Sequence, residues 1–198
     1  MFYEPKDGHG LPKNPFNSLV VPRPIGWISS LDGDGNVNLA PYSFFNGVAY
    51  NPPAVMFSSG HGQVEDDGMK DSLRNILETG EFVQNFSTWD TRAAMNDTSA
   101  AMNDTSATTA KSVDELAEAG LTPIASTLVK PPRIMESPIH FECKLVGTYD
   151  LPNTTDNNKY TVVFGEAIGV HIADDLIMEN GQIDIAKLHP IARMGYQD

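Results

Sequence analysis

The residues best suited to chemistry are Lys70, Asp71 and Ser72, in the segment "MKDSLRNI". They stand where a polar loop becomes an amphipathic helix, so free backbone N–H groups, the positive end of the helix dipole, a hydroxyl and an ammonium group converge there. That combination suits a phosphate. The alternative is a plain helix N-cap, Asp71 or Ser72, beside a solvated lysine, which is the more common meaning of such a tripeptide taken alone.

A second candidate is the stretch "NLAPYSFFNGVAYNPPAVMFSSG", residues 38–60. Its flanks alternate as strands do, but Pro41, Ser43 and Gly47 interrupt the pattern. A bent strand exposes backbone groups that could read the edge of a planar heterocycle. The sequence thus suggests that the strand is interrupted because it faces a ligand. Further candidates near strand ends are Ser58 and Ser59; Trp27 and Tyr42 could stack on a ring, or Tyr42 could be core.

The elements that must position these groups are mostly strands. Strands are expected over 25–31 and from 37 onward, joined by a turn, and over 53–60, 81–87, 138–151 and 158–174. A helix is expected over 71–79, ending at Gly80. The whole chain, 1–198, is expected to be one domain, with an irregular arm at 1–17, a helix-and-loop insertion at 88–120 and an irregular tail. The expected fold class is α+β, mainly β: a barrel with appended helices.

An exact tandem heptapeptide lies within the insertion: Ala94–Ala100 and Ala101–Ala107 both read "AMNDTSA". Two copies are too few for a repeat architecture. Asn, Asp, Thr and Ser favour caps and turns over a core. The duplication is therefore interpreted as a lengthened surface connection.

Composition excludes several classes of function. The formal net charge is −13 and the isoelectric point is near 4.6, so nucleic acid and anionic membranes are poor partners. Cys143 is the only cysteine, which leaves no intrachain disulfide and no cysteine-based zinc site. The five histidines show no ligand spacing, so no metal is expected, and no catalytic acid, base or nucleophile stands out. Without a recognisable signal peptide or membrane span, a cytoplasmic protein is expected.

Taken in order, the segments "RPIGWISSLDGDGNVNLAPYSFFNGVAYNPPAVMFSSG", "KDSLRNILETGEFVQNF", "MNDTSA", "SPIHFECKL", "GEAIGVHIAD" and "PIARMGY" resemble the flavin reductase-like, FMN-binding split-barrel family. The similarity runs from about Asn17 to near the end of the chain. It implies a six-stranded antiparallel split barrel and a homodimer with FMN held near the subunit interface. The duplicated heptapeptide departs from the family pattern, which has one copy.

The resemblance also implies roles for particular residues. Lys70, Asp71 and Ser72 would hold the FMN phosphate, helped by Ser43 and by Ser58 and Ser59. The flavin ring would lie along Ser30 and the backbone of Asn38, Ala40, Pro41 and Tyr42. His171 would be either a neighbour of the cofactor or a strand residue with a satisfied imidazole.

The activity implied is transfer of a hydride from NADH or NADPH to flavin, with no catalytic side chain because the chemistry belongs to the cofactor. Reduced flavin would then serve an acceptor or a partner oxygenase. One alternative is an FMN-carrying electron-transfer protein reduced by a protein partner. A lower-ranked one is an oxidase like the pyridoxamine phosphate oxidases, which would need more arginine than this chain offers. A barrel without cofactor affinity is a further possibility.

Overall fold

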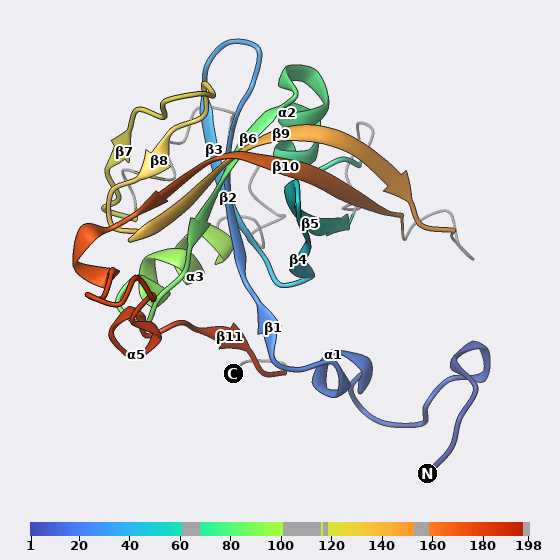
Figure 1. Ribbon diagram of the computed structural model, residues 1–198. Helices are drawn as coiled ribbons and strands as arrows, with labels where there is room; N and C mark the ends of the chain where they lie inside the picture. The colour runs from blue at the N-terminus through green and yellow to red at the C-terminus, as the bar shows by residue number, and fades with distance from the viewer. Residues whose placement is uncertain (61–67, 101–115, 117–118, 153–158, 196–198) are drawn as a thin grey trace.

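The computed structural model describes residues 1–60, 68–100, 116, 119–152 and 159–195 (Figure 1). Strands dominate it. The helices are η1 (Pro5–Asp7), α1 (Phe16–Leu19), α2 (Asp71–Thr79), α3 (Arg92–Ala100), η2 (Asp174–Leu176) and α5 (Ile185–Leu188). The strands are β1 (Arg23–Pro24), β2 (Gly26–Leu31), β3 (Val37–Tyr42), β4 (Phe45–Tyr50), β5 (Pro53–Gly60), β6 (Glu81–Phe86), β7 (Pro123–Ile124), β8 (Arg133–Ile134), β9 (Ile139–Asp150), β10 (Tyr160–Ile172) and β11 (Ala192–Arg193).

The main sheet has seven strands in the order β3-β2-β6-β9-β10-β5-β4, and every neighbouring pair is antiparallel. The mainly β fold class is confirmed, with one strand more than the expected six. Six of the seven strands match the six expected segments, and the seventh is β4. It was missed because its residues after Phe45 are all exposed and carry no apolar alternation that marks a core strand.

The topology explains the interrupted stretch in a way the sequence did not indicate. Strands β3 and β4 form opposite edges of the sheet, yet only Ser43 and Phe44 separate them in the chain. The sheet must therefore curl until its two edges meet, which is how a barrel closes. At this corner the Ser58 amide donates to the Phe44 carbonyl at 2.8 Å. The interruption is thus first of all the corner of the barrel.

Two buried clusters lie on opposite faces of the sheet, because side chains along a strand alternate. Ile28 belongs to the cluster inside the barrel, together with Phe57 and Phe82, whose rings meet edge to face at 5.8 Å. This interior is tight: a Cβ on Gly165 would lie 2.3 Å from the Phe82 ring. Trp27, next to Ile28 in the chain, belongs to the second cluster.

Helix α3 covers that second cluster, and it includes one copy of the repeat. It contains the first heptapeptide, Ala94–Ala100, in which Met95 and Thr98 are buried. The first copy is therefore helical and partly core, because helical spacing brings Met95 and Thr98 onto one face. The second copy, 101–107, and residues 108–115, 117 and 118 of the insertion lie outside the described residues.

The N-terminal arm runs away from the barrel, and it contains the short η1 and α1 (Figure 1). The tail is likewise less irregular than expected, since it holds α5 and β11, and β11 pairs with β1. No helix in the described ranges is long and apolar enough to cross a membrane.

Candidate functional site

Helix α2 begins without a side-chain cap. Lys70 is the N-cap residue, with extended backbone (φ −72°, ψ 149°), and its side chain makes no capping hydrogen bond to the helix. Asp71 and Ser72 are thus the first two helical residues, which corrects their expected role as caps. The Asp71 carboxylate instead accepts from Arg74 Nη1 at 2.7 Å. The helix ends at Gly80 as expected, in a left-handed conformation with φ +74°.

Lys70 is a half-buried cation. Among the described residues, its ammonium forms no ion pair with a carboxylate, and its nearest aromatic partner is the Tyr42 ring, whose centroid lies 6.0 Å away. Burial lowers the pKa of Lys70 below its ordinary value of 10.5. A charge withdrawn from water without a counter-ion is costly. The start of α2 can therefore take an anion.

Two of the predicted hydroxyl groups, those of Ser30 and Ser72, are buried and hydrogen-bonded between α2 and the sheet. Asn38 Nδ2 donates to Ser72 Oγ at 2.6 Å, and Asn75 Nδ2 donates to Ser30 Oγ at 3.2 Å. Ser30 and Ser72 have almost no exposed surface. These bonds tie α2 to β2 and β3. In this structure the side chains position the helix start, and the part of Ser72 best placed for an anion is its backbone N–H.

The other predicted serines flank the barrel corner. Ser43 and Ser58 are half-buried, and Ser59 is fully buried. The Ser59 hydroxyl has no hydrogen-bond partner among the described residues. A buried hydroxyl of this kind is uncommon, because an unpaired polar group inside a protein costs free energy. Ser59 thus lacks a hydrogen-bond partner among the described residues, just as Lys70 lacks a carboxylate partner there.

Trp27 does not support the predicted stacking role. Its side chain is fully buried in the second cluster, and its indole N–H donates to Thr98 Oγ1 at 3.1 Å. Tyr42 is also mostly core, since its ring packs against Phe57 with centroids 4.6 Å apart. The neighbouring Ala40 is buried and Pro41 is half-buried. At these three positions, a ligand would therefore contact the backbone more than the side chains.

Arg23, a further cation near the corner, is buried and structural. Its Nη1 donates to the carbonyl of Val20 at 2.8 Å and to that of Asn17, so it caps the end of α1. Its guanidinium lies 5.6 Å from the centre of the Phe44 ring.

The structure does not bring His171 to Lys70. On β10, Thr161 pairs with Ser59, whereas His171 lies ten residues further along, toward the opposite end of the strand (Figure 1). Ten residues of strand span roughly 33 Å. Of the two roles left open for His171, a satisfied imidazole is the one observed: Nε2 lies 2.5 Å from Glu142 Oε1.

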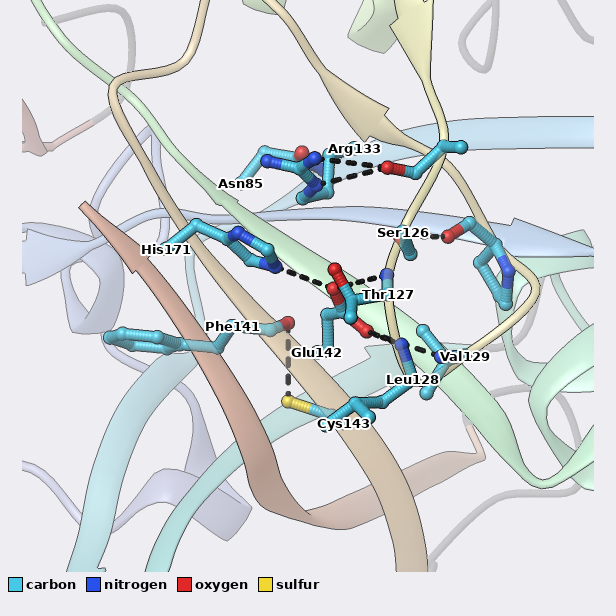
Figure 2. A network of polar contacts seen from close by, with 12 residues as sticks. Asn85, Ser126, Thr127, Leu128, Val129, Arg133, Phe141, Glu142, Cys143 and His171 are labelled. Atoms are coloured by element: carbon cyan, nitrogen blue, oxygen red, sulfur yellow. Dashed lines mark hydrogen bonds and ion pairs between the residues drawn. The ribbon is translucent and has the colours of Figure 1, made fainter. Parts of the chain in front are cut away.

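Glu142 is the residue that the sequence analysis missed (Figure 2). Its fully buried carboxylate accepts the amides of Thr127, Leu128 and Val129 at 2.8, 2.5 and 3.1 Å, in addition to His171. Burial alone would raise the pKa of Glu142, but these hydrogen bonds outweigh it and lower the pKa below 4.5. The available signal was a glutamate in the middle of the alternating strand "IHFECKLVG", next to Cys143 in the chain.

The histidines around Glu142 do not make a metal centre. His140 Nε2 is 2.8 Å from the Ile134 carbonyl, and burial lowers the pKa of His140. Both Nε2 atoms are thus committed to protein acceptors. Within the described part of the chain, no three His, Cys, Asp or Glu residues gather as a metal-binding group.

Comparison with known proteins places the chain in a family. The model of the flavin reductase like domain matches residues 18–187, so the chain belongs to the flavin reductase-like family of split-barrel flavoproteins. An uncharacterized protein of Aquifex aeolicus is 39% identical over 180 residues, covering 89% of this chain and 83% of the relative. The protein YwrF of Bacillus subtilis is 32% identical over 183 residues, covering 90% and 82%.

Solved structures agree on the fold. Nitrilotriacetate monooxygenase component B from Bacillus cereus aligns with a TM-score of 0.84 and 31% identity, covering all of this chain and 93% of its own. The 2-nitrobenzoate 2-nitroreductase NbaA of Pseudomonas fluorescens aligns with a TM-score of 0.74 and 28% identity, covering 92% and 81%. Flavoredoxin of Desulfovibrio vulgaris, at 20% identity and a TM-score of 0.68, shares the fold.

Proposed function

We propose that this protein is an FMN-binding oxidoreductase that uses NADH or NADPH to reduce its flavin. Family membership supports a flavin. The observation that carries the choice of FMN is Lys70, a half-buried cation without a carboxylate partner in the described residues, at the uncapped start of α2. FMN ends in a phosphate, the group for which such a helix start is suited.

The residues fit a phosphate in charge and in hydrogen-bonding capacity. Lys70 supplies the positive charge, and the N–H groups of the first turn of α2, including that of Ser72, supply donors. Ser59 supplies a buried hydroxyl without a partner among the described residues. Asp71 would repel the anion, but its carboxylate is held by Arg74. The site would therefore favour a phosphomonoester over an uncharged flavin.

The ring would lie along the barrel corner. There, β3 ends at Tyr42, and Ser43 and Phe44 carry the chain from one sheet edge to the other. Bound flavin supplies the hydride and electron chemistry, and the chain supplies position and polarity. For this reason no acid, base or nucleophile from the chain is required.

We also propose that the chain forms a homodimer through β4. Within the described part of the chain this edge strand pairs only with β5, its residues from Asn46 to Tyr50 are exposed, and Tyr50 is 95% exposed. No Asp, Glu, Lys or Arg occurs between Asp34 and Glu65. An exposed, uncharged edge strand needs covering, and for a chain of net charge −13 a neutral surface is where a second copy can approach without repulsion. Val48→Lys should give a monomer in light scattering, and a variant that stays dimeric would contradict this interface.

A second candidate is an FMN-carrying electron-transfer protein. The net charge of −13 favours it, since an acidic surface suits docking to a basic redox partner. The same flavin site would serve both functions, and the electron donor separates them.

The deciding experiment is anaerobic addition of NADH, and separately NADPH, to the purified protein loaded with FMN. Rapid bleaching of the visible flavin absorbance by one nucleotide is expected and would name the donor. Absorbance that persists with both, but bleaches with dithionite, would favour the electron carrier. A protein that binds neither FMN nor FAD would refute the flavin assignment altogether.

A further inference from the structure

The loop between β7 and β8, residues 125–132, is closed on itself. The Arg133 guanidinium donates from Nη2 to the Ala125 carbonyl at 2.9 Å, which joins the two ends of the loop. Across its middle, Ser126 Oγ donates to the Pro131 carbonyl at 2.6 Å. Figure 2 shows this loop lying against β9 and β10. It is thus a compact loop of fixed shape, of the kind that can move as a unit.

Four successive amides of this loop donate to the barrel, and the Pro132 carbonyl at its end accepts from Ser29 Oγ on β2 at 2.6 Å. Those of residues 127–129 donate to Glu142 on β9. The next one, from Lys130, donates to Glu81 Oε2 on β6 at 2.9 Å. Glu142 therefore holds three of the four, and it does so from a fully buried position, whereas Glu81 is half-buried.

The acceptor capacity of Glu142 is full. A carboxylate offers about four lone-pair positions. Oε1 accepts from Thr127 and His171, and Oε2 accepts from Leu128 and Val129. A proton added to either oxygen has no free position, so it must displace a donor. Three of the four donors belong to the loop.

We propose that Glu142 is a protonation-controlled latch, which fixes residues 127–129 of the loop to the barrel while it is ionised and loosens them when it takes up a proton. His171 is its proton-bearing partner. The imidazole is partly exposed, with 28% of its side-chain surface accessible, and it meets Glu142 through Nε2 only.

The other charged or titratable groups around Glu142 do not substitute for it. His140, on the same strand, is committed to the Ile134 carbonyl. Arg133, on β8, holds the Ala125 carbonyl. Glu81, on β6, accepts a single loop amide. Uptake of a proton by the Glu142 carboxylate itself is thus the event that removes the negative charge to which three loop amides donate.

The test is hydrogen exchange of the loop amides at pH 7 in Glu142→Gln, with Glu81→Gln as the matched control. The first variant removes the charge that accepts three amides, so exchange at residues 127–129 should accelerate about 10-fold or more while amides of β6 and β9 stay protected. The control should affect Lys130 alone. If residues 127–129 exchange in Glu142→Gln as they do in the wild type, the proposal is wrong.

A titration of the wild type covers the case in which Glu142→Gln does not fold. The side-chain carboxyl carbon of Glu142 and the amides of residues 127–129 would be followed by NMR from pH 7 downward. A shared midpoint below pH 4.5, reached before the barrel amides change, is expected. Loop amides that change only together with global unfolding would refute the latch. In His171→Phe, which removes one donor to Glu142, the midpoint should move to higher pH.

Discussion

Lys70 and Glu142 are both charged groups withdrawn from water, and the chain treats them in opposite ways. Glu142 receives four hydrogen bonds from the protein, which lower its pKa despite complete burial. Lys70 has no carboxylate partner in the described residues, and burial lowers its pKa toward the neutral form. The sites also lie toward opposite ends of the barrel, one at the start of α2 and the other beside the β7–β8 loop (Figure 1).

This contrast distinguishes a charged residue that stabilises the fold from one that is available to bind a ligand. A buried charge whose partners all come from the chain contributes to folding, and it is costly to remove. A half-buried charge without a counter-ion lowers stability unless a ligand brings the opposite charge. Substitution of the two residues should therefore change stability in opposite directions, and only one of them should change ligand affinity.

The largest effect is expected for Glu142→Ala. It leaves three amides and the His171 N–H without an acceptor, so the free energy of unfolding should fall by about 3–5 kcal/mol. Urea denaturation measures this, with Glu81→Ala, which frees one amide, as the milder control. The wild type should also lose stability as pH falls below 4.5, because the folded-state pKa of Glu142 is lower than that value. Equal losses in the two variants would contradict the special role of Glu142.

Lys70→Met should weaken FMN binding by about 10–100-fold, or roughly 1.4–2.8 kcal/mol. The apoprotein should be as stable as the wild type or more so, because a desolvated charge is removed. Fluorescence titration with FMN measures the affinity, and Lys144→Met, at an exposed position on β9, is the control. A loss of apoprotein stability without a loss of affinity would mean that Lys70 is structural.

The same comparison predicts a pH dependence for Lys70. Its folded-state pKa lies below 10.5, so the apoprotein gains stability relative to Lys70→Met as pH rises from that lowered pKa to 10.5. FMN affinity should fall over the same interval, since the ammonium loses its charge. Denaturation and titration series on both proteins measure the two trends, and parallel curves for wild type and variant would contradict them.

Smaller effects are expected for two buried serines, one on stability and the other on FMN affinity. Ser29 Oγ donates to the Pro132 carbonyl at 2.6 Å, whereas the Ser59 hydroxyl has no partner among the described residues. Ser29→Ala should therefore cost about 1–2 kcal/mol of stability and leave FMN affinity unchanged. Ser59→Ala should leave apoprotein stability nearly unchanged and weaken FMN binding several-fold. If both variants lose only stability, Ser59 is not part of the site.

The smallest effect is expected for Asp71→Asn. Its ion pair with Arg74 is largely exposed and contributes little to stability. Removal of a negative charge beside the phosphate site should strengthen FMN binding by no more than a few-fold. Titration at low and high salt measures this, because screening should reduce the difference. Weaker binding by Asp71→Asn would show that its carboxylate contributes to the site.

The sequence by itself determined the elements and the family. Six of the seven strands and helix α2 followed from local patterns, because alternation, turn residues and a terminal glycine act over a few residues. The ordered motifs from Arg23 to Tyr196 by themselves indicate the flavin reductase-like family. Lys70 stood out because a cation at a helix start is visible in one short segment.

Only the tertiary structure decided which side chains meet. Glu142 and His171 are 29 residues apart and come together because β9 and β10 pair. Trp27 became core because α3 covers its face of the sheet. Strand β4 and the corner before it depend on closure of the barrel, and closure involves all seven strands together. Periodicity reports which side of a strand a residue is on, whereas its partners depend on register and closure, which no local pattern contains.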